Sequence, residues 1–180
     1  MANKNVLRFC LNVPFLVLPL WGCTGETTHA TGKKSLHDQK VTPVSMADRA
    51  RISEQEAVVL RLLRARFPEA KLEHGEADLR WLQRLVDEKV LRRDQTYELQ
   101  CLGAVLGQVL VARTPLRWVV VEDQHGRELA LEYPNTSVIV FPVTMISKRI
   151  EDGRDVDVVP LYRTVAAHVE KLKHDAEYKR

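Results

Sequence analysis

The segment that most constrains the fold is an almost uniformly apolar stretch, ELQCLGAVLGQVLVA, at residues 98–112. Its apolar side chains recur at helical spacing on two adjacent stripes, so a helix over residues 95–112 has little polar surface to present to water. We expect it to be the central buried helix of a globular domain. Gly103 and Gly107 lie four residues apart on one face. Because glycine costs a helix up to about 1 kcal/mol relative to alanine, we predict that both permit close packing by another backbone.

Three short strand patterns follow this helix: RWVVVE from Arg117, ELALEY from Glu128 and SVIVF from Ser137. Turn-forming residues separate them, and Gly126 is expected to have a structural role in the first turn. Connections this short join antiparallel neighbours, so we predict a three-stranded antiparallel meander packed on the buried helix. With additional N- and C-terminal helices, the predicted fold class is α+β.

The additional helices have their own start and stop signals. The residues SEQE at 53–56 have the form of a capping box, which predicts a helix start there. Helical periodicity also predicts a helix over residues 77–90 and a last helix from about Val159. A short helix is expected over residues 143–152, which Pro142 precedes and Gly153 follows.

Residues 1–22 have the order of a secretory signal peptide. A positively charged start precedes an apolar segment at residues 9–21, and a small residue then precedes Cys23. The apolar segment is shorter than the roughly 20 residues that a membrane-spanning helix needs, and it contains two prolines. We therefore expect a cleaved leader rather than a transmembrane helix.

The four residues Leu20-Trp21-Gly22-Cys23 resemble the lipobox of bacterial lipoproteins, whose cysteine is acylated and becomes the mature N-terminus. The resemblance implies lipid attachment at Cys23. Thr24, in place of an aspartate, implies sorting to the outer membrane, facing the periplasm. Trp21 departs from the small residue that is commoner at its position, and ordinary signal-peptide cleavage is the alternative. The expected organisation is a signal peptide at 1–22, a flexible tether at 23–44 and a single α+β domain at 45–180.

The charge of the mature chain bears on which partners it can bind, and its cysteine content bears on whether it can form a disulfide. Removing residues 1–22 takes away two of the 27 basic residues and none of the 24 acidic ones, so the mature chain is close to neutral. This offers no electrostatic case for nucleic acid binding. With Cys10 in the leader and Cys23 acylated, Cys101 has no partner for an internal disulfide. We expect Cys101 to be a small buried hydrophobe rather than a nucleophile.

Three pieces of the chain between Tyr97 and Asp157 resemble one bacterial family. They are YELQCLGAVLGQVL, LRWVVVEDQHGRELAL, and VFPVTMISKRIEDG followed by VDV. The family is domain of unknown function 3806. The resemblance carries no activity with it. It implies that the Gly-x-x-x-Gly helix, the three strands and the Met-Ile-Ser-Lys-Arg segment form one unit.

No set of residues has the spacing of a known catalytic, cofactor or metal site. Lys148 and Arg149 stand among apolar residues of a predicted helix and are candidates for contact with an anion or a partner. Salt bridges to acidic residues at 151–155 are the competing interpretation, and we favour it. Glu122 and His125 belong to a predicted hairpin, where turn formation is favoured over metal binding because a tight turn supplies few rigid ligands.

Three functional hypotheses follow. The first is a lipid-anchored periplasmic binding or interaction module without catalytic activity, whose partner is an unidentified envelope protein; protection against an envelope-targeted toxin is one specific version. The alternative is an envelope enzyme acting on cell-wall or lipid substrates, with Lys148 and Arg149 binding an anion and Glu122 or His125 assisting. The third is small-ligand binding between helix and sheet. We expect no cofactor in any of the three.

Overall fold

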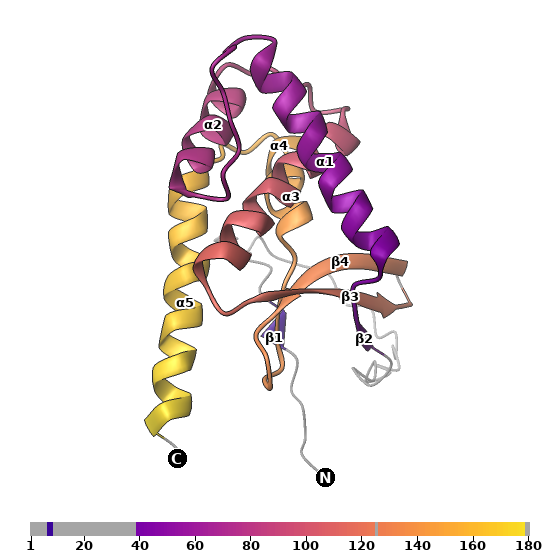
Figure 1. Cartoon of the computed structure of the whole chain (residues 1–180), viewed down its shortest axis with the longest axis vertical. Helices are drawn as coiled ribbons and strands as arrows, with labels where there is room; N and C mark the ends of the chain where they lie inside the picture. The colour runs from indigo at the N-terminus through magenta and orange to yellow at the C-terminus, as the bar shows by residue number, and fades with distance from the viewer. Residues whose placement is uncertain (1–6, 9–38, 125, 179–180) are drawn as a thin grey trace, which may run out of the picture.

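A computed structural model describes residues 7–8, 39–124 and 126–178. Cys23 and His125 lie outside these residues. The described chain has an α+β fold in which the helices gather on one side of a sheet (Figure 1). The predicted fold class is therefore confirmed. No helix in the described ranges combines the length and the hydropathy needed to cross a bilayer.

The sheet has the strand order β1-β5-β4-β3-β2. The predicted antiparallel meander is present as β3 (Arg117–Asp123), β4 (Gly126–Glu132) and β5 (Val138–Val140). The prediction of only three strands is wrong, because β2 (Lys40–Pro43) pairs antiparallel with β3. A two-residue strand, β1 (Leu7–Arg8), which lies inside the predicted signal peptide, pairs parallel with β5.

Strand β2 lies at the end of the stretch that we expected to be tether. The polar composition of that stretch hides a short segment, KVTPV, whose last residue, Val44, is buried against Ile52, Val120 and Leu129. Pro43 is tolerated because β2 is an edge strand, where a missing N–H removes no necessary ladder bond. The sheet therefore includes four residues of the stretch that is predicted to be tether.

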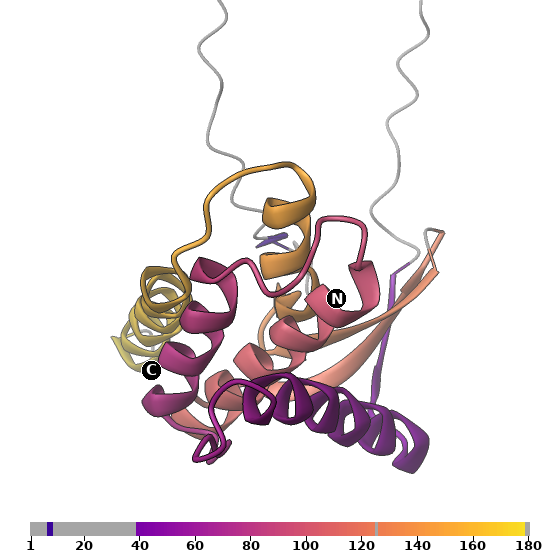
Figure 2. The ribbon, with the colours of Figure 1, turned by 90° about the horizontal axis from the view of Figure 1, so that it is seen from above.

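Five helices are described: α1 (Met46–Arg64), α2 (Glu76–Asp87), α3 (Thr96–Arg113), α4 (Pro142–Glu151) and α5 (Val158–Tyr178). α3 is the central helix, as predicted, and every residue from 101 to 107 is buried. Seen from above, α3 lies between α1 and α4, while α2 and α5 lie side by side at one flank (Figure 2).

The predicted capping box at residues 53–56 is wrong, because α1 starts earlier. Its N-cap is Ser45, whose hydroxyl oxygen accepts the backbone N–H of Asp48, while the Asp48 carboxylate accepts the backbone N–H of Ser45 at 2.8 Å. The same Ser-x-x-acid spacing occurs at both places, and the residues between them contain no helix breaker. The four residues of the expected box consequently lie inside α1, where Gln55 faces the core.

The two glycines of α3 contact different neighbours. A Cβ atom at Gly103 would overlap the backbone carbonyl oxygens of Pro142 and Val143 at the start of α4. One at Gly107 would lie 2.5 Å from the ring of Trp118 on β3. The Trp118 indole N–H in turn donates to Gln108 Oε1 at 2.8 Å. The missing side chains thus let α3 pack directly against both α4 and the sheet.

Candidate functional site: a cleft between two helix ends

A cleft of about 670 Å³ lies between the α2–α3 connection and the α4–α5 connection. Its volume is within the usual range of small-molecule sites, roughly 300–1,000 Å³. The inner wall is apolar and is made by Leu85, Val86, Leu91, Leu99, Leu102, Ile150 and Val156. The rim carries four basic and two acidic side chains, those of Lys89, Arg92, Arg93, Arg154, Asp87 and Asp155. The cleft therefore combines an apolar interior with a net positive mouth.

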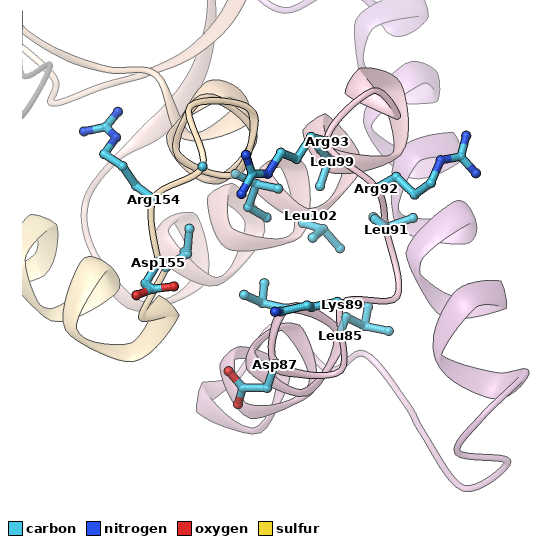
Figure 3. Close-up of a pocket in the computed structure, with 14 residues that line it drawn as sticks. Leu85, Asp87, Lys89, Leu91, Arg92, Arg93, Leu99, Leu102, Arg154 and Asp155 are labelled. Carbon is cyan, nitrogen blue, oxygen red and sulfur yellow. The ribbon is translucent and has the colours of Figure 1, made fainter.

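Lys89 is positioned by the end of α2. The helix terminates in a Schellman motif, in which the backbone N–H groups of Lys89 and Val90 donate to the carbonyl oxygens of Val86 and Leu85. Lys89 occupies the left-handed position of this motif, with φ of 49°, where glycine is the usual residue. Its side chain extends across the mouth of the cleft (Figure 3).

Arg93 is positioned by the end of α4, which terminates in the same way. Gly153 has φ of 73°, and the next residue, Arg154, donates its backbone N–H to Arg149. The Arg93 guanidinium packs over Gly153 so closely that a Cβ there would lie 2.7 Å from Nη1. The unpaired carbonyl groups at a helix C-terminus favour a nearby cation. Arg93 thus bridges the two connections that form the cleft.

Two of the four rim cations are engaged elsewhere. Arg92 and Arg154 each pair with an aspartate two residues away, at 3.0 and 2.7 Å, and both point away from the cleft (Figure 3). Hydrogen bonding within the Arg92 pair raises the pKa of Arg92 and lowers the pKa of its aspartate. Among the described residues, no ion pair or side-chain hydrogen bond engages Lys89 or Arg93. These two are the charges that a ligand can use.

Gln83 holds one side of the cleft in place. Its Nε2 donates to Asp87 at 2.8 Å and to the carbonyl oxygen of Val156 at 3.1 Å, while its Oε1 accepts the backbone N–H of Val158 at 2.7 Å. One side chain therefore ties α2 to the start of α5, across more than 70 residues of sequence. Because the Asp87 carboxylate accepts this hydrogen bond, it is less available to pair with the cations at the rim of the cleft.

The side chains that line the cleft are apolar or charged. None of the residues that line it is a serine, threonine, cysteine, histidine or tyrosine. In the described part of the chain, no group of three or more His, Cys, Asp or Glu side chains is placed to hold a metal ion. An apolar wall beside two available cations matches a molecule that has an apolar body and an anionic group.

The polar residues that the sequence singled out do not lie in this cleft. Lys148 is exposed on α4, and Arg149 donates through Nη1 to the carbonyl oxygen of Met145 in the same helix. Asp152, which we expected to pair with one of them, pairs with Arg154. Lys148 and Arg149 therefore do not belong to the site that contains the cleft cations Lys89 and Arg93.

The remaining candidates are placed as follows. Glu122 is exposed on β3, where its register partner is Arg127, and it does not line the cleft. Cys101 is fully buried in α3, and burial raises the pKa of its thiol to about 11, so the thiol is protonated at neutral pH. It is a buried hydrophobe, as predicted. Gly126 has φ of 121° at the hairpin, a conformation that favours glycine.

Sequence reasoning missed Lys89 and Arg93. A signal was present, because the segment VDEKVLRRD that ends α2 contains no glycine or asparagine at the point where a helix stop is expected. A helix that stops at a lysine places that lysine under backbone strain, and strained residues cluster at functional sites. The position of Arg93 beside Gly153 had no local signal, because the two are 60 residues apart.

All residues that line the cleft lie between positions 85 and 156. Residues 78–162 match the model of a domain of unknown function, DUF3806. These residues form a DUF3806 domain. The finding confirms the family resemblance of the sequence. The DUF3806 domain runs from α2 into α5 and contains the whole cleft, while β2 and α1 lie outside it.

A solved structure supports the fold beyond the DUF3806 segment. A crystal structure from Bacteroides thetaiotaomicron VPI-5482 is similar with a TM-score of 0.67 and 16% sequence identity. The similarity covers 78% of this chain and 52% of that chain, so this chain spans about half the length of the solved protein. At this identity the comparison shows the fold alone. No curated protein has significant sequence similarity to the chain.

Proposed function

We propose that this protein is a lipid-anchored, non-catalytic binding module of the bacterial envelope, whose DUF3806 domain holds an amphipathic anionic ligand in the cleft. The apolar wall beside Lys89 and Arg93 is the observation that carries the proposal. The lipobox resemblance at Cys23 supports attachment to the outer membrane on the periplasmic side. A binding domain at a membrane surface meets amphipathic molecules, so the proposed location and the proposed ligand class are consistent with each other.

The left-handed backbone conformation of Lys89 supports a role for this residue in binding rather than in folding. A non-glycine residue in the left-handed region costs roughly 1–2 kcal/mol, and glycine would end the helix at less cost. The Lys89 side chain makes no ion pair in the described structure that offsets this cost. An anion bound at the mouth would give the side chain a partner, since hydrogen bonds to charged groups stabilise by about 1.5–3 kcal/mol.

This feature yields a variant that separates binding from stability. We expect Lys89→Gly to raise the free energy of unfolding by up to about 1 kcal/mol, because it relieves the strained position. The same change is expected to weaken binding of dodecanoate about ten-fold, measured by isothermal titration calorimetry on the full chain. Arg93→Gln should also weaken binding. Arg92→Gln is the matched control, because Arg92 points away from the cleft and is paired with Asp94.

A neutral amphiphile with the same acyl length, such as dodecanol, tests the charge requirement. Dodecanol is expected to bind the unmodified protein more weakly than dodecanoate does. Its affinity for the Lys89→Gly variant should equal its affinity for the unmodified protein. Equal binding of dodecanoate by the unmodified protein and by both cleft variants would contradict the proposed site. No binding of either probe would reject the proposed ligand class.

A further inference from the structure

The two ends of the sheet differ in their protection against pairing with another chain. An edge strand presents unpaired backbone N–H and C=O groups, and lysine or proline residues are a usual protection. At one end, β2 carries Lys40 and Pro43. At the other end, the two-residue strand β1 lies beside β5, whose three residues, Val138–Val140, include no charge and no proline. The outer side of β5 is therefore suited to receive a further strand.

β5 has the properties of an inner strand of a sheet. Val140 is buried in the core beneath the helices, and Ile139 is buried among the apolar residues of the opposite face. Burial on both faces is typical of strands in the interior of a sheet. The carbonyl oxygen of Val138 accepts the N–H of Tyr133, the residue after β4. Because successive residues of a strand direct their backbone groups to opposite sides, the N–H and C=O of Ile139 face the outer edge.

The pairing of β1 shows how a strand can bind at this outer edge. Leu7 and Arg8 pair in parallel with Val138 and Ile139 (Figure 1). Two copies of the β5 edge related by a two-fold axis would instead pair antiparallel. The parallel pairing therefore favours a segment of different sequence over a second copy of β5.

A small apolar groove lies between β5 and α5. Val138 and Val140 line one side of it, and Thr164, Val165 and Val169 of α5 line the other. Its volume is about 20 Å³, which is enough for a methyl-sized group, since one water molecule needs roughly 10–15 Å³. Paired residues of neighbouring strands lie on the same face of a sheet. A residue paired with Val138 is therefore directed to the face that contains the groove.

We infer that the outer edge of β5 is a strand-acceptor site, which β1 occupies in the whole chain and an extended segment of an envelope protein occupies once residues 1–22 are removed. The inference rests on the proposed processing at Cys23, which separates β1 from the domain. The segment that fits pairs in parallel with β5, has an aliphatic residue opposite Val138 and has no proline at the paired positions. Backbone hydrogen bonds provide the affinity, and the groove provides the selectivity.

The test uses a fluorescent peptide with the sequence of residues 3–9, NKNVLRF, whose binding to the full chain is measured by fluorescence anisotropy. A full chain that carries both Leu7→Pro and Arg8→Pro, the double-proline chain, is expected to bind the peptide at least about ten-fold more tightly than the unmodified chain. Proline cannot donate a ladder hydrogen bond, so these changes free the edge. In the unmodified chain, β1 competes at the effective concentration of an attached segment, on the order of mM. A peptide with the same two prolines should bind neither chain.

Two variants of α5, each made in the double-proline chain, test the groove. Thr164→Trp is expected to weaken peptide binding at least about ten-fold, because the indole ring fills the groove. Arg163→Trp is the matched control, since it adds the same ring at an exposed position of α5 that does not line the groove. Thr164 is also exposed, so both variants should fold, and the Tm of each checks this. Equal peptide binding by the two variants would overturn the role of the groove.

Three other outcomes would contradict the inference. Absence of peptide binding to the double-proline chain, or equal binding by that chain and the unmodified one, would overturn the acceptor site and leave the proposals for Cys23 and the cleft standing. Concentration-dependent dimerisation of the double-proline chain in analytical ultracentrifugation would overturn the choice of occupant in favour of a second copy. If the native protein retained residues 1–22, the peptide would still bind the double-proline chain, but the partner site would be rejected together with the processing.

Discussion

The Asp48 carboxylate concentrates several roles in one side chain. It closes the capping box of α1 and also pairs with Arg127 on β4 at 2.8 Å, so it joins a helix start to the sheet. Burial acts to raise the pKa of this carboxyl, but hydrogen bonds from Ser45 and Arg127 outweigh it and hold the pKa below the ordinary value of 3.8. The side chain is 6% exposed, which limits screening by water.

This depressed pKa predicts a contribution to stability that depends on pH. Because the folded-state pKa lies below the unfolded-state value, the contribution is present above pH 3.8 and is lost as the pH falls through the folded-state pKa. We expect Asp48→Asn to lower the free energy of unfolding by roughly 1–3 kcal/mol at pH 7. The difference from the unmodified protein should shrink at pH 3, as measured by urea unfolding at both pH values.

The control for this experiment is Asp94→Asn. Asp94 also pairs with an arginine, but the pair is exposed, so its removal should change stability little. A difference between Asp48→Asn and the unmodified protein that stays constant from pH 7 to pH 3 would show that the Asp48 charge does not stabilise the fold.

At the scale of elements, the contact between α3 and α4 depends on Gly103. Alanine would improve the intrinsic helix propensity of α3 by up to about 1 kcal/mol. Its methyl group would, however, overlap two backbone carbonyl oxygens, which cannot rotate away as a side chain can. We therefore expect Gly103→Ala to destabilise the fold by roughly 1–3 kcal/mol in thermal or urea unfolding.

The matched control lies in the same helix. Ala112→Gly changes an exposed position of α3, so it should cost no more than about 1 kcal/mol through propensity alone. If Gly103→Ala were as stable as the unmodified protein, the close approach of α4 to α3 would not be a requirement of the fold.

At the scale of the whole molecule, the proposed anchor makes a direct prediction. The intact mass and N-terminal peptide of the mature protein should correspond to a chain that begins at Cys23 and carries acyl groups. A Cys23→Ala version should lack the acyl mass and leave the membrane fraction. An unmodified N-terminus in the mature protein would remove the basis for a tethered module, while the cleft and its test would stand.

Processing at Cys23 also affects the sheet. It would remove β1, which pairs with Val138 and Ile139 of β5. The edge of β5 would then lack the neighbour that it has in the whole chain.

The elements with strong local signals could be predicted closely from the sequence. Strands β3, β4 and β5, helices α2 and α4, and the start of α5 lie within a few residues of the expected positions, because periodicity, Pro142 and Gly153 act over short distances. α1 was placed too late, since two stretches with the same capping pattern compete and local sequence does not rank them. β2 was missed because four residues of an edge strand carry too little pattern to stand out from a polar segment.

The apolar pattern of residues 95–112 was enough to establish a buried central helix with close packing at its glycines, since a helix without a polar face has to be covered on all sides. The cleft could not be predicted in this way. It depends on Lys89 and Arg93 meeting the end of α4. Such a site joins residues 50 or more positions apart, and their side chains come together only when the helices pack.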